Sequence, residues 1–413
     1  MNKNRYYGSH VLYRVLIKHE HLKSAMAAVL PSAIEPQDKA WIQHICYMSL
    51  RHYFSLTARW QKFLHKPLKD QLVAQLLTFS MAQKVHAEVP DHAIVNEAVN
   101  TAELLKKKWA KGLINTVLKQ SLADQGFEPG DEQQLYEHPA WWLAMLKKDW
   151  PDDWTEIIRA NNQQPPLWIR YKPNAEMKPG QAHTHLKNAC RIIDKQLPHD
   201  LLSEGLATVQ DAAAQWAAHL LQPQDGERIL DACAAPGGKS SHLLELNPNI
   251  QLDIVEQDKQ RLQLVKHNLQ RLDLKAHRLI HGDAAEPDAW YQGQKYDKIL
   301  LDVPCSASGV VRRHPDIKLL RQAEDMTLLT RLQTRILQAA ADLLVSGGHL
   351  LYATCSVFRA ENERQIKRFL KNNPQFTEQA IGLPDSQAQK HGHQILTGRA
   401  DMDGFYYCLL KKS

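Results

Sequence analysis

The sequence predicts an all-α amino-terminal domain followed by an α/β domain with a Rossmann-like, doubly wound parallel sheet. Three observations lead to this prediction. Residues 5–122 place apolar side chains at helical spacing and show no strand alternation. From residue 212 onward, strand-like and helix-like segments alternate. Three cysteine-bearing segments each follow a short apolar run of strand type. A chain of 413 residues also exceeds what one core usually organises.

Composition indicates the cellular setting. The chain is 44% hydrophobic and 23% charged, as is usual for a soluble globular protein. No apolar run is long enough to span a bilayer, and residues 1–5 lack the apolar stretch of a signal peptide. We therefore expect a cytoplasmic monomer without a membrane partner. The six cysteines include no Cys-x-x-Cys pair, so free thiols and no bound metal are expected.

The helical domain is predicted over residues 1–135. Prolines break its apolar periods at Pro31, Pro36, Pro67 and Pro90. Residues 90–118 resemble the NusB-type RNA-binding helical domain, and Asp91 is expected to cap the helix that follows it. Residues 1–150 carry 19 Lys and Arg against 14 Asp and Glu, a net charge of +5, whereas residues 151–413 carry 32 against 31. This excess suits an RNA partner but is equally typical of a solvated surface.

The middle of the chain predicts two connecting parts. Residues 136–164 contain a pair of tryptophans in a helical stretch and are interpreted as a helical linker. Residues 165–211 predict a small α+β RNA-binding subdomain, with a strand near residues 165–172 and a helix over residues 181–195. The α/β domain is then expected over residues 212–413.

The first loop of the α/β domain is rich in small residues. It follows an apolar strand, so its backbone can approach a ligand closely and a helix can begin near Lys239. A Walker A loop requires glycine where Cys233 stands, and the pattern Gly-x-Gly-x-x-Gly is absent from the loop. The loop reads Asp231-Ala232-Cys233-Ala234-Ala235-Pro236-Gly237-Gly238-Lys239. A nucleotide-phosphate site is therefore weakly supported.

Carboxylates end successive predicted strands at Asp231, Glu256, Asp283 and Asp302. In nucleoside-binding α/β domains, one such carboxylate accepts hydrogen bonds from the ribose hydroxyls, which suits Glu256. Asp283 could bond an adenine amino group. A single acid at a strand end is as typical of a cap or turn. The ordered set favours S-adenosylmethionine as the cofactor.

Two thiols, Cys305 and Cys355, follow two further predicted strands. Loops at the carboxyl ends of parallel strands share one crevice, so we expect these thiols beside the small-residue loop. Cytosine C5 is a poor nucleophile, but a thiolate that adds to C6 activates C5 for methyl transfer. Such an enzyme needs a cysteine, an acid near N3 and a group that assists release, and Cys355, Asp302 and Cys305 are of the right types. By their residue types alone, Cys305 and Cys355 are equally good nucleophiles.

The chain resembles the RNA cytosine-5 methyltransferases of the NOL1/NOP2/Sun group, in particular the bacterial 16S rRNA branch (Sun/Fmu/RsmB) with a NusB-like domain. Residues 231–239, 302–316, 352–356 and 403–405 carry the resemblance in order. It implies that Cys355 is the nucleophile, that Cys305 assists product release and that Asp302 contacts both cofactor and cytosine. The cofactor-binding residues that it implies are Cys233, Ala234, Ala235, Pro236, Gly237, Gly238, Lys239, Glu256, Asp283 and Asp302.

Two departures from that group concern the cofactor and the RNA. Glu256 stands where the group more often has Asp, and the stretch between Cys190 and Gly205 is shorter, which predicts a trimmed RNA-binding subdomain. The sequence thus predicts methylation of a cytosine C5 in 16S rRNA through a covalent cysteine–C6 adduct. One alternative is a NusB-like transcription or assembly factor with a vestigial catalytic domain, which the retained thiol pair opposes. Another is a DNA methyltransferase, but no DNA-reading motif is evident.

Overall fold

The computed structural model describes residues 3–87, 89–173, 175–177, 180–193 and 197–413. The chain divides into two compact units. One unit comprises Met1–Gln164 together with Val311–Gln322, and the other comprises Pro165–Val310 and Ala323–Ser413. The first unit therefore takes a short segment from the middle of the second one.

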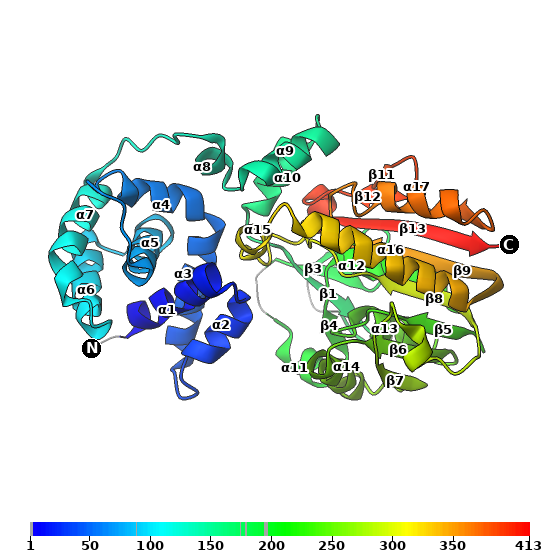
Figure 1. The fold of residues 1–413 in the computed structure, drawn as a ribbon. Coiled ribbons are helices and arrows are strands. Elements are labelled where there is room, and N and C mark those ends of the chain that lie inside the picture. The colour runs from blue at the N-terminus through cyan, green and yellow to red at the C-terminus, as the bar shows by residue number, and fades with distance from the viewer. Residues whose placement is uncertain (1–2, 88, 174, 178–179, 194–196) are drawn as a thin grey trace. The chain divides into compact units, whose positions relative to one another are not determined.

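The described residues of the first unit are helical, as the apolar spacing predicts (Figure 1). Its helices are α1 (Asn4–Lys18), α2 (Leu22–Val29), α3 (Pro36–Arg51), α4 (Tyr53–Gln61), α5 (Gln71–His86), α6 (Asp91–Leu104), η1 (Lys108–Ala110), α7 (Lys111–Ala123), α8 (Glu132–Tyr136), α9 (Ala140–Asp149), α10 (Trp154–Asn161) and α15 (Ile317–Leu320). The expectation of consecutive helices over residues 5–122 is confirmed.

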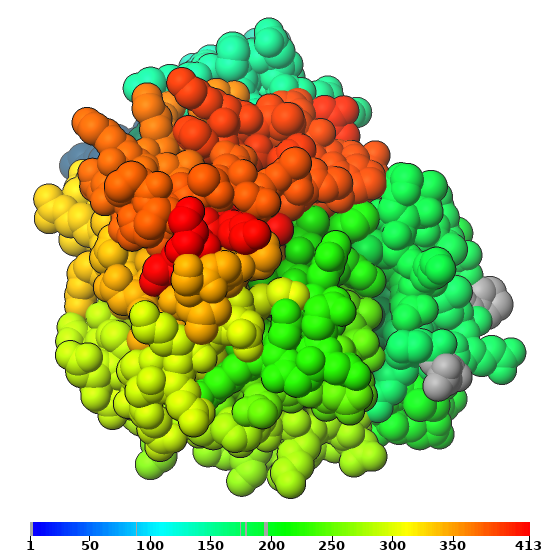
Figure 2. All heavy atoms as spheres, turned by 90° about the vertical axis from the view of Figure 1, so that its right-hand side faces the viewer, coloured from blue at the N-terminus to red at the C-terminus, as the bar shows by residue number. Residues whose placement is uncertain are grey.

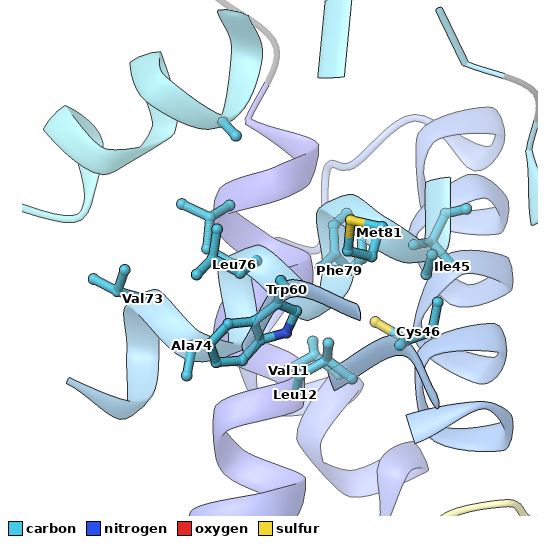
Figure 3. Close-up of a cluster of buried hydrophobic side chains, with 14 of the residues drawn as sticks. Val11, Leu12, Ile45, Cys46, Trp60, Val73, Ala74, Leu76, Phe79 and Met81 are labelled. Atoms are coloured by element: carbon cyan, nitrogen blue, oxygen red, sulfur yellow. The ribbon is translucent and has the colours of Figure 1, made fainter. Parts of the chain in front are cut away.

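The core of the helical unit forms around α5, which packs on α1, α3, α4 and α6. Figure 3 shows Trp60 of α4 among apolar side chains of α1, α3 and α5. Its indole Nε1 donates a hydrogen bond to Thr78 Oγ1 at 3.0 Å, which satisfies a polar group in a buried position. Helix α1 approaches closely at Gly8, where a Cβ atom would lie 2.2 Å from the Phe79 ring. Glycine is therefore required at this contact.

The start of α6 differs from the prediction. Helix α6 begins at Asp91 itself, Pro90 occupies the N-cap position, and Asp91 makes no capping hydrogen bond. The Asp91 carboxylate instead accepts a hydrogen bond from Lys84 Nζ at 2.6 Å. The prediction that Asp91 caps this helix is wrong, because the extended backbone of Pro90 already places Asp91 in the first turn. An acidic residue there still interacts favourably with the helix dipole.

The segment Val311–Gln322 is packed inside the helical unit. Lys318 is fully buried and donates to the Arg51 carbonyl oxygen at 2.7 Å and to Asn162 Oδ1 at 3.3 Å. The Arg51 guanidinium donates to the carbonyl oxygen of Arg312 at 2.7 Å. Asp316 Oδ2 accepts from the Leu22 backbone N–H at 3.2 Å. Burial lowers the pKa of Lys318 to about 7.

The second unit begins with a small antiparallel sheet of order β2-β3-β1-β4. Its strands are β1 (Leu167–Tyr171), β2 (Gln181–Ala182), β3 (Ala189–Ile192) and β4 (Ala207–Val209). The strand predicted near residues 165–172 is confirmed. The helix predicted over residues 181–195 is wrong: the range contains β2 and β3, and residues 194–195 lie outside the described part. Ile169 and Cys190 pair across β1 and β3 and enter one apolar cluster, so packing on the sheet decides the conformation.

The main sheet of the second unit has the order β11-β12-β13-β9-β8-β5-β6-β7, and β10 pairs with β13. Its strands are β5 (Arg228–Asp231), β6 (Gln251–Glu256), β7 (Arg278–His281), β8 (Tyr296–Asp302), β9 (Leu344–Thr354), β10 (Phe376–Gln379), β11 (Gln387–Ala388), β12 (His393–Ile395) and β13 (Phe405–Lys412). The run from β9 to β7 is parallel, whereas β13 is antiparallel to β9. The predicted parallel core is thus extended by an antiparallel edge. Figure 2 shows the end of β13, in red, at the surface beside the orange residues of the neighbouring β10 region.

Helices cover both faces of this sheet, whereas α11 (His199–Ser203) packs on the small sheet. The covering helices are α12 (Ala212–Leu221), α13 (Gly238–Leu246), α14 (Lys259–Arg271), α16 (Asp325–Leu343) and α17 (Glu363–Asn372). Along β8, Leu300 enters the core formed with α12 and α13, while Ile299 and Leu301 enter the core formed with α16 and α17. Strands buried on both faces explain the continuous apolar run of β8. The chain passes from β5 outward to β6 and β7 and then returns to β8, so the carboxyl ends of β5 and β8 flank the switch point where ligands bind in such sheets.

Candidate active site

A cavity of about 280 Å³ lies at the carboxyl ends of the parallel strands in the second unit. Its wall combines loop residues after β5, β6, β7, β8 and β9 with two apolar residues of α16. The wall is formed by Ala232, Cys233, Ala235, Glu256, Gln257, Arg261, Asp283, Ala284, Asp302, Val303, Pro304, Cys305, Ala307, Leu332, Ile336 and Cys355. The fold therefore brings together the strand-end acids Glu256, Asp283 and Asp302 and all three loop thiols.

The loop after β5 turns sharply before α13. Gly237 has φ +93°, and a Cβ atom there would lie 3.1 Å from the Val265 side chain of α14, so the turn favours glycine. The Ala235–Pro236 peptide bond is cis. Of the predicted cofactor residues in this loop, Cys233 and Ala235 line the cavity. Outside the cavity wall are Ala234, Pro236 and Gly237 of the loop and Gly238 and Lys239, which begin α13.

Asp231 has a structural place behind this loop. Its side chain is fully buried, and its Oδ2 accepts a hydrogen bond from Ser240 Oγ at 2.6 Å. Burial raises the pKa of Asp231 to about 7. Asp231 thus ties the end of β5 to the first turn of α13.

The cavity carboxylates are held by neighbouring donors. Glu256 is 6% exposed, and its two oxygens accept hydrogen bonds from the backbone N–H groups of Ala235 at 3.1 Å and Asp258 at 3.0 Å. Asp283 accepts from the Ala285 N–H at 2.8 Å and from the Gln257 side chain at 3.3 Å. Both carboxylates are therefore oriented before any ligand binds, which lowers the entropy cost of binding.

Asp302 pairs with Lys239 at the end of β8. Lys239 Nζ lies 2.5 Å from Asp302 Oδ2 and 5.0 Å from the centroid of the Phe405 ring. Burial acts to lower the pKa of Lys239, but the negative charges of Asp302, Cys355 and Asp231 outweigh burial and raise it. Lys239 is therefore a fixed cation that holds Asp302.

The two thiols predicted from the sequence are in contact. Cys305 Sγ lies 3.4 Å from Cys355 Sγ, and Cys355 is the more exposed of the two. The hydrogen bond to Cys355, burial and the charge of Glu361 together raise the pKa of Cys305. Loss of the proton from Cys305 is therefore disfavoured.

Two arginines that contact residues 235–238 were not predicted from the sequence. Arg170 of β1 is buried, donates to the Gly238 carbonyl oxygen at 2.8 Å and pairs with Glu245 at 2.8 Å. Arg261 of α14 donates to the Ala235 carbonyl oxygen at 2.9 Å. Each arginine lies more than twenty residues from its loop partner in the sequence. Their contacts depend on tertiary structure, so no local sequence pattern predicts them.

Within the parts of the chain that the structure describes, no helix is long and apolar enough to cross a membrane. Among the same residues, His, Cys, Asp and Glu side chains form no group of three or more that could hold a metal ion.

Three family models match the chain. The model of the 16S rRNA methyltransferase RsmB/F family matches residues 218–411, and the NusB family model matches residues 2–123. A model described as the RsmF/B-like methyltransferase ferredoxin-like domain matches residues 138–175.

Known proteins resemble the chain over nearly its whole length. The ribosomal RNA small subunit methyltransferase B of Vibrio vulnificus is 40% identical, and the match covers 98% of each protein. The crystal structure of PH0851 superposes with a TM-score of 0.83 at 21% identity, covering 100% of this chain and 99% of that one. The structure of NSun6 from Pyrococcus horikoshii with SFG gives a TM-score of 0.59 at 19% identity, covering 66% of this chain and 98% of that one. The two structures support the fold, and the sequence matches show that the chain belongs to the 16S rRNA methyltransferase RsmB/F family, a family of S-adenosylmethionine-dependent methyltransferases.

Proposed function

We propose that this protein methylates C5 of a cytosine in 16S ribosomal RNA, using S-adenosylmethionine and a covalent bond between Cys355 and C6 of the base. The observation that carries the proposal is the contact between Cys305 and Cys355, 3.4 Å apart, on the wall of the cavity that also holds Glu256, Asp283 and Asp302. Family membership supports the methyl-transfer reaction. A vestigial catalytic domain would have no need of two thiols in contact.

The cavity residues fit S-adenosylmethionine. Glu256 is oriented by two backbone N–H groups and can accept hydrogen bonds from ribose hydroxyls, while Asp283 can accept from the adenine amino group. Small side chains at Ala232 and Ala235 leave room for close approach of the ligand. The cavity volume of about 280 Å³ is near the lower end of the range of about 300–1,000 Å³ for ligand pockets. When bound, the cofactor supplies a methyl group on a positively charged sulfur.

The chain's own residues then divide the work on the cytosine. The Cys355 thiolate adds to C6, and the electron pair of the C5–C6 double bond becomes available for C5 to take the methyl group. Asp302, which Lys239 holds, is proposed to bind the base near N3. Afterwards the C5 proton leaves to water, the C5–H electron pair re-forms the C5–C6 double bond, and the C6–S bond breaks with its electron pair returning to Cys355. The Cys305 S–H, 3.4 Å away, can donate to the departing sulfur and so assists this step.

The helical unit is proposed to bind the ribosomal RNA. Its match to the NusB family model and the net charge of +5 over residues 1–150 support an electrostatic contact with the phosphate backbone. We expect the protein to act in the cytoplasm as a monomer.

Bisulfite sequencing of 16S rRNA from cells with and without this protein tests the proposal. A cytosine that resists conversion in cells with the protein should become convertible when the gene is deleted, and a plasmid copy should restore the protection. A plasmid copy carrying Cys355→Ala should not restore it. An unchanged conversion pattern after deletion would contradict C5 methylation of this RNA.

A further inference from the structure

Each cysteine of the thiol pair is followed by a serine. Ser306 follows Cys305 and Ser356 follows Cys355, and both serines are fully buried. Their hydroxyl groups donate to the same oxygen, Glu361 Oε2, at 2.6 Å and 2.5 Å. One carboxylate oxygen therefore joins the two loops that carry the thiols.

The second oxygen of Glu361 is held in the same region. Glu361 Oε1 accepts from the Ser306 backbone N–H at 2.8 Å and from Gln333 Nε2 at 3.0 Å. Gln333 of α16 also donates to the Pro304 carbonyl oxygen at 2.9 Å, one residue before Cys305. Residues on both sides of Cys305 are thus tied to Glu361 directly or through Gln333.

Further bonds fix the Cys355 loop against the same centre. Ser308 Oγ lies 2.9 Å from Ser356 Oγ and accepts from the Val357 N–H at 2.9 Å. Asn362 Nδ2 donates to the Ser356 carbonyl oxygen at 2.9 Å. Hydrogen-bonded networks of this kind are rigid when every member has a partner.

Glu361 is fully buried, which has an energetic consequence. A buried carboxylate loses its hydration, and an apolar side chain of similar size would pack at this position at lower cost. Packing alone therefore does not account for a carboxylate here. Its hydrogen bonds run to the residues next to the two thiols, which points to a role in their arrangement.

We propose that Glu361 is a positioning residue for the two thiols: its carboxylate holds the Cys305 and Cys355 loops in register and disfavours a negative charge on Cys305. This inference rests on the proposed function of the thiol pair. No atom is transferred by Glu361 itself. Its effect is to decide which thiol donates and which attacks.

The electrostatic surroundings of Cys305 support this assignment. Cys355 and Glu361 both act to raise the pKa of the Cys305 thiol, in addition to burial. Tyr352 of β9 donates its hydroxyl to the Glu361 carbonyl oxygen at 2.7 Å. The cation of Lys239 interacts with Cys355 and is paired with Asp302. Glu361 thus disfavours a negative charge on Cys305, whereas Lys239 places a positive charge near Cys355.

Alkylation of the full-length protein by iodoacetamide, followed by mass spectrometry of each cysteine, tests the role of the charge. Three variants are compared with the wild type. Glu361→Gln removes the charge but keeps the side-chain size, Ser356→Ala removes one donor but keeps the charge, and Glu363→Gln makes the same change two residues away, where Glu363 pairs with Arg359. Thermal unfolding of each variant reports whether the fold is intact.

The pH at which half of Cys305 is alkylated should fall by about one unit in Glu361→Gln and should not fall in Ser356→Ala or Glu363→Gln. With a ribosomal RNA transcript, the kcat of Glu361→Gln should fall by about 100-fold at nearly unchanged KM, because the thiols lose their register. Either a wild-type kcat or an unchanged alkylation profile in Glu361→Gln would overturn the proposal. If Glu361→Gln does not fold, Ser356→Ala carries the test, and a wild-type kcat there would overturn it.

The alkylation arm uses no RNA, so it separates this inference from the proposed function. If the wild type methylates no cytosine but Glu361→Gln shifts the Cys305 profile, the proposed reaction fails while the electrostatic effect of Glu361 stands. If the wild type methylates cytosine and the Cys305 profile is the same in all variants, the inference fails alone.

Discussion

At the scale of single residues, the site depends on side chains that are held before a ligand arrives. Glu256 is the clearest case, because its two oxygens are fixed by separate backbone donors at the edge of the cavity. Asp283 and Asp302 are held in a similar way by Gln257 and Lys239. Because these side chains are already oriented, ligand binding costs less conformational entropy, and replacing one of them should change the affinity measurably.

Glu256→Ala should weaken S-adenosylmethionine binding by about 1.5–3 kcal/mol, the usual contribution of a hydrogen bond to a charged group. Calorimetry on the folded variant measures the change. Glu286→Ala is the control, because Glu286 is exposed and pairs with Arg335 outside the cavity wall. Equal affinity in Glu256→Ala and the wild type would remove Glu256 from the cofactor site.

The buried Lys318 predicts a pH dependence of stability. Its pKa is about 7 in the folded protein against an ordinary 10.5, so between these values the unfolded chain binds a proton that the folded chain does not. The free energy of unfolding should therefore rise with pH across this window because of Lys318. Urea denaturation at about pH 7 and about pH 9 should show a larger rise for the wild type than for Lys318→Met. An equal rise in both proteins would contradict the assignment.

The sequence predicted part of the site and missed the rest for a physical reason. Strand-end positions identified Glu256, Asp302, Cys305 and Cys355, because parallel strands bring their carboxyl ends to one edge. Glu361 was missed, since its partner Ser306 lies 55 residues away in the chain. The repeated Cys-Ser pair was the available signal, but the shared carboxylate exists only in the folded chain.

At the scale of elements, loops touch where the sequence has glycine. Gly309, in the loop after Cys305, donates its N–H to the Cys355 carbonyl oxygen at 2.9 Å and accepts from the Gly404 N–H at 2.9 Å. A Cβ atom on Gly309 would lie 2.0 Å from the Gly404 carbonyl oxygen. The loops that carry the two thiols and the loop before β13 thus meet backbone to backbone.

Gly309→Ala should therefore lower the free energy of unfolding by about 1–3 kcal/mol, as overpacking of a tight contact does, and should reduce methylation. Gly382→Ala is a matched control, because a Cβ atom there meets nothing within 4 Å. Denaturation curves and a methylation assay on both variants make the comparison. Similar stability of the two variants would show that the Gly309 contact is unimportant.

Helices and strands were predicted best where the apolar residues follow a single clear sequence pattern. The helices over residues 5–122 and strands such as β8 have clear apolar patterns, and both are present. The range 181–195 contains the apolar residues Leu186, Ala189 and Ile192, whose spacing also fits one face of a helix. Ala189–Ile192 instead form β3 and pair with β1, whereas Leu186 lies before the strand. Contacts with β1 therefore favour a strand where the local sequence fits a helix equally well.

At the scale of the whole molecule, the helical unit includes one segment that interrupts the sequence of the second unit. Val311–Gln322 begins six residues after Cys305 and is buried in the helical unit, where Arg312 is 3% exposed and Lys318 fully buried. The helical unit therefore does more than supply positive charge. It also buries the continuation of the loop that carries Cys305.

A chain that lacks residues 1–122 should expose this segment. Limited trypsin digestion should cleave the shortened chain after Arg312, because α1 and α3 no longer cover the segment, while the same bond in the full-length protein stays intact. Mass spectrometry of the fragments locates the cuts. Protection of the segment in the shortened chain would contradict the burial described for it.

The two thiols are proposed to have different roles. If Cys355 attacks and Cys305 assists its departure, Cys305→Ala should remain bound to its RNA after methyl transfer, because the C6–S bond breaks too slowly. Cys355→Ala should be inactive and form no such complex.

Denaturing gel electrophoresis of each variant after incubation with a ribosomal RNA transcript and S-adenosylmethionine is the most direct measurement. We expect a slow-migrating protein–RNA band for Cys305→Ala, none for Cys355→Ala, and none for the double variant. A band with Cys355→Ala and none with Cys305→Ala would reverse the two roles, and full methylation activity in both single variants would contradict the covalent mechanism.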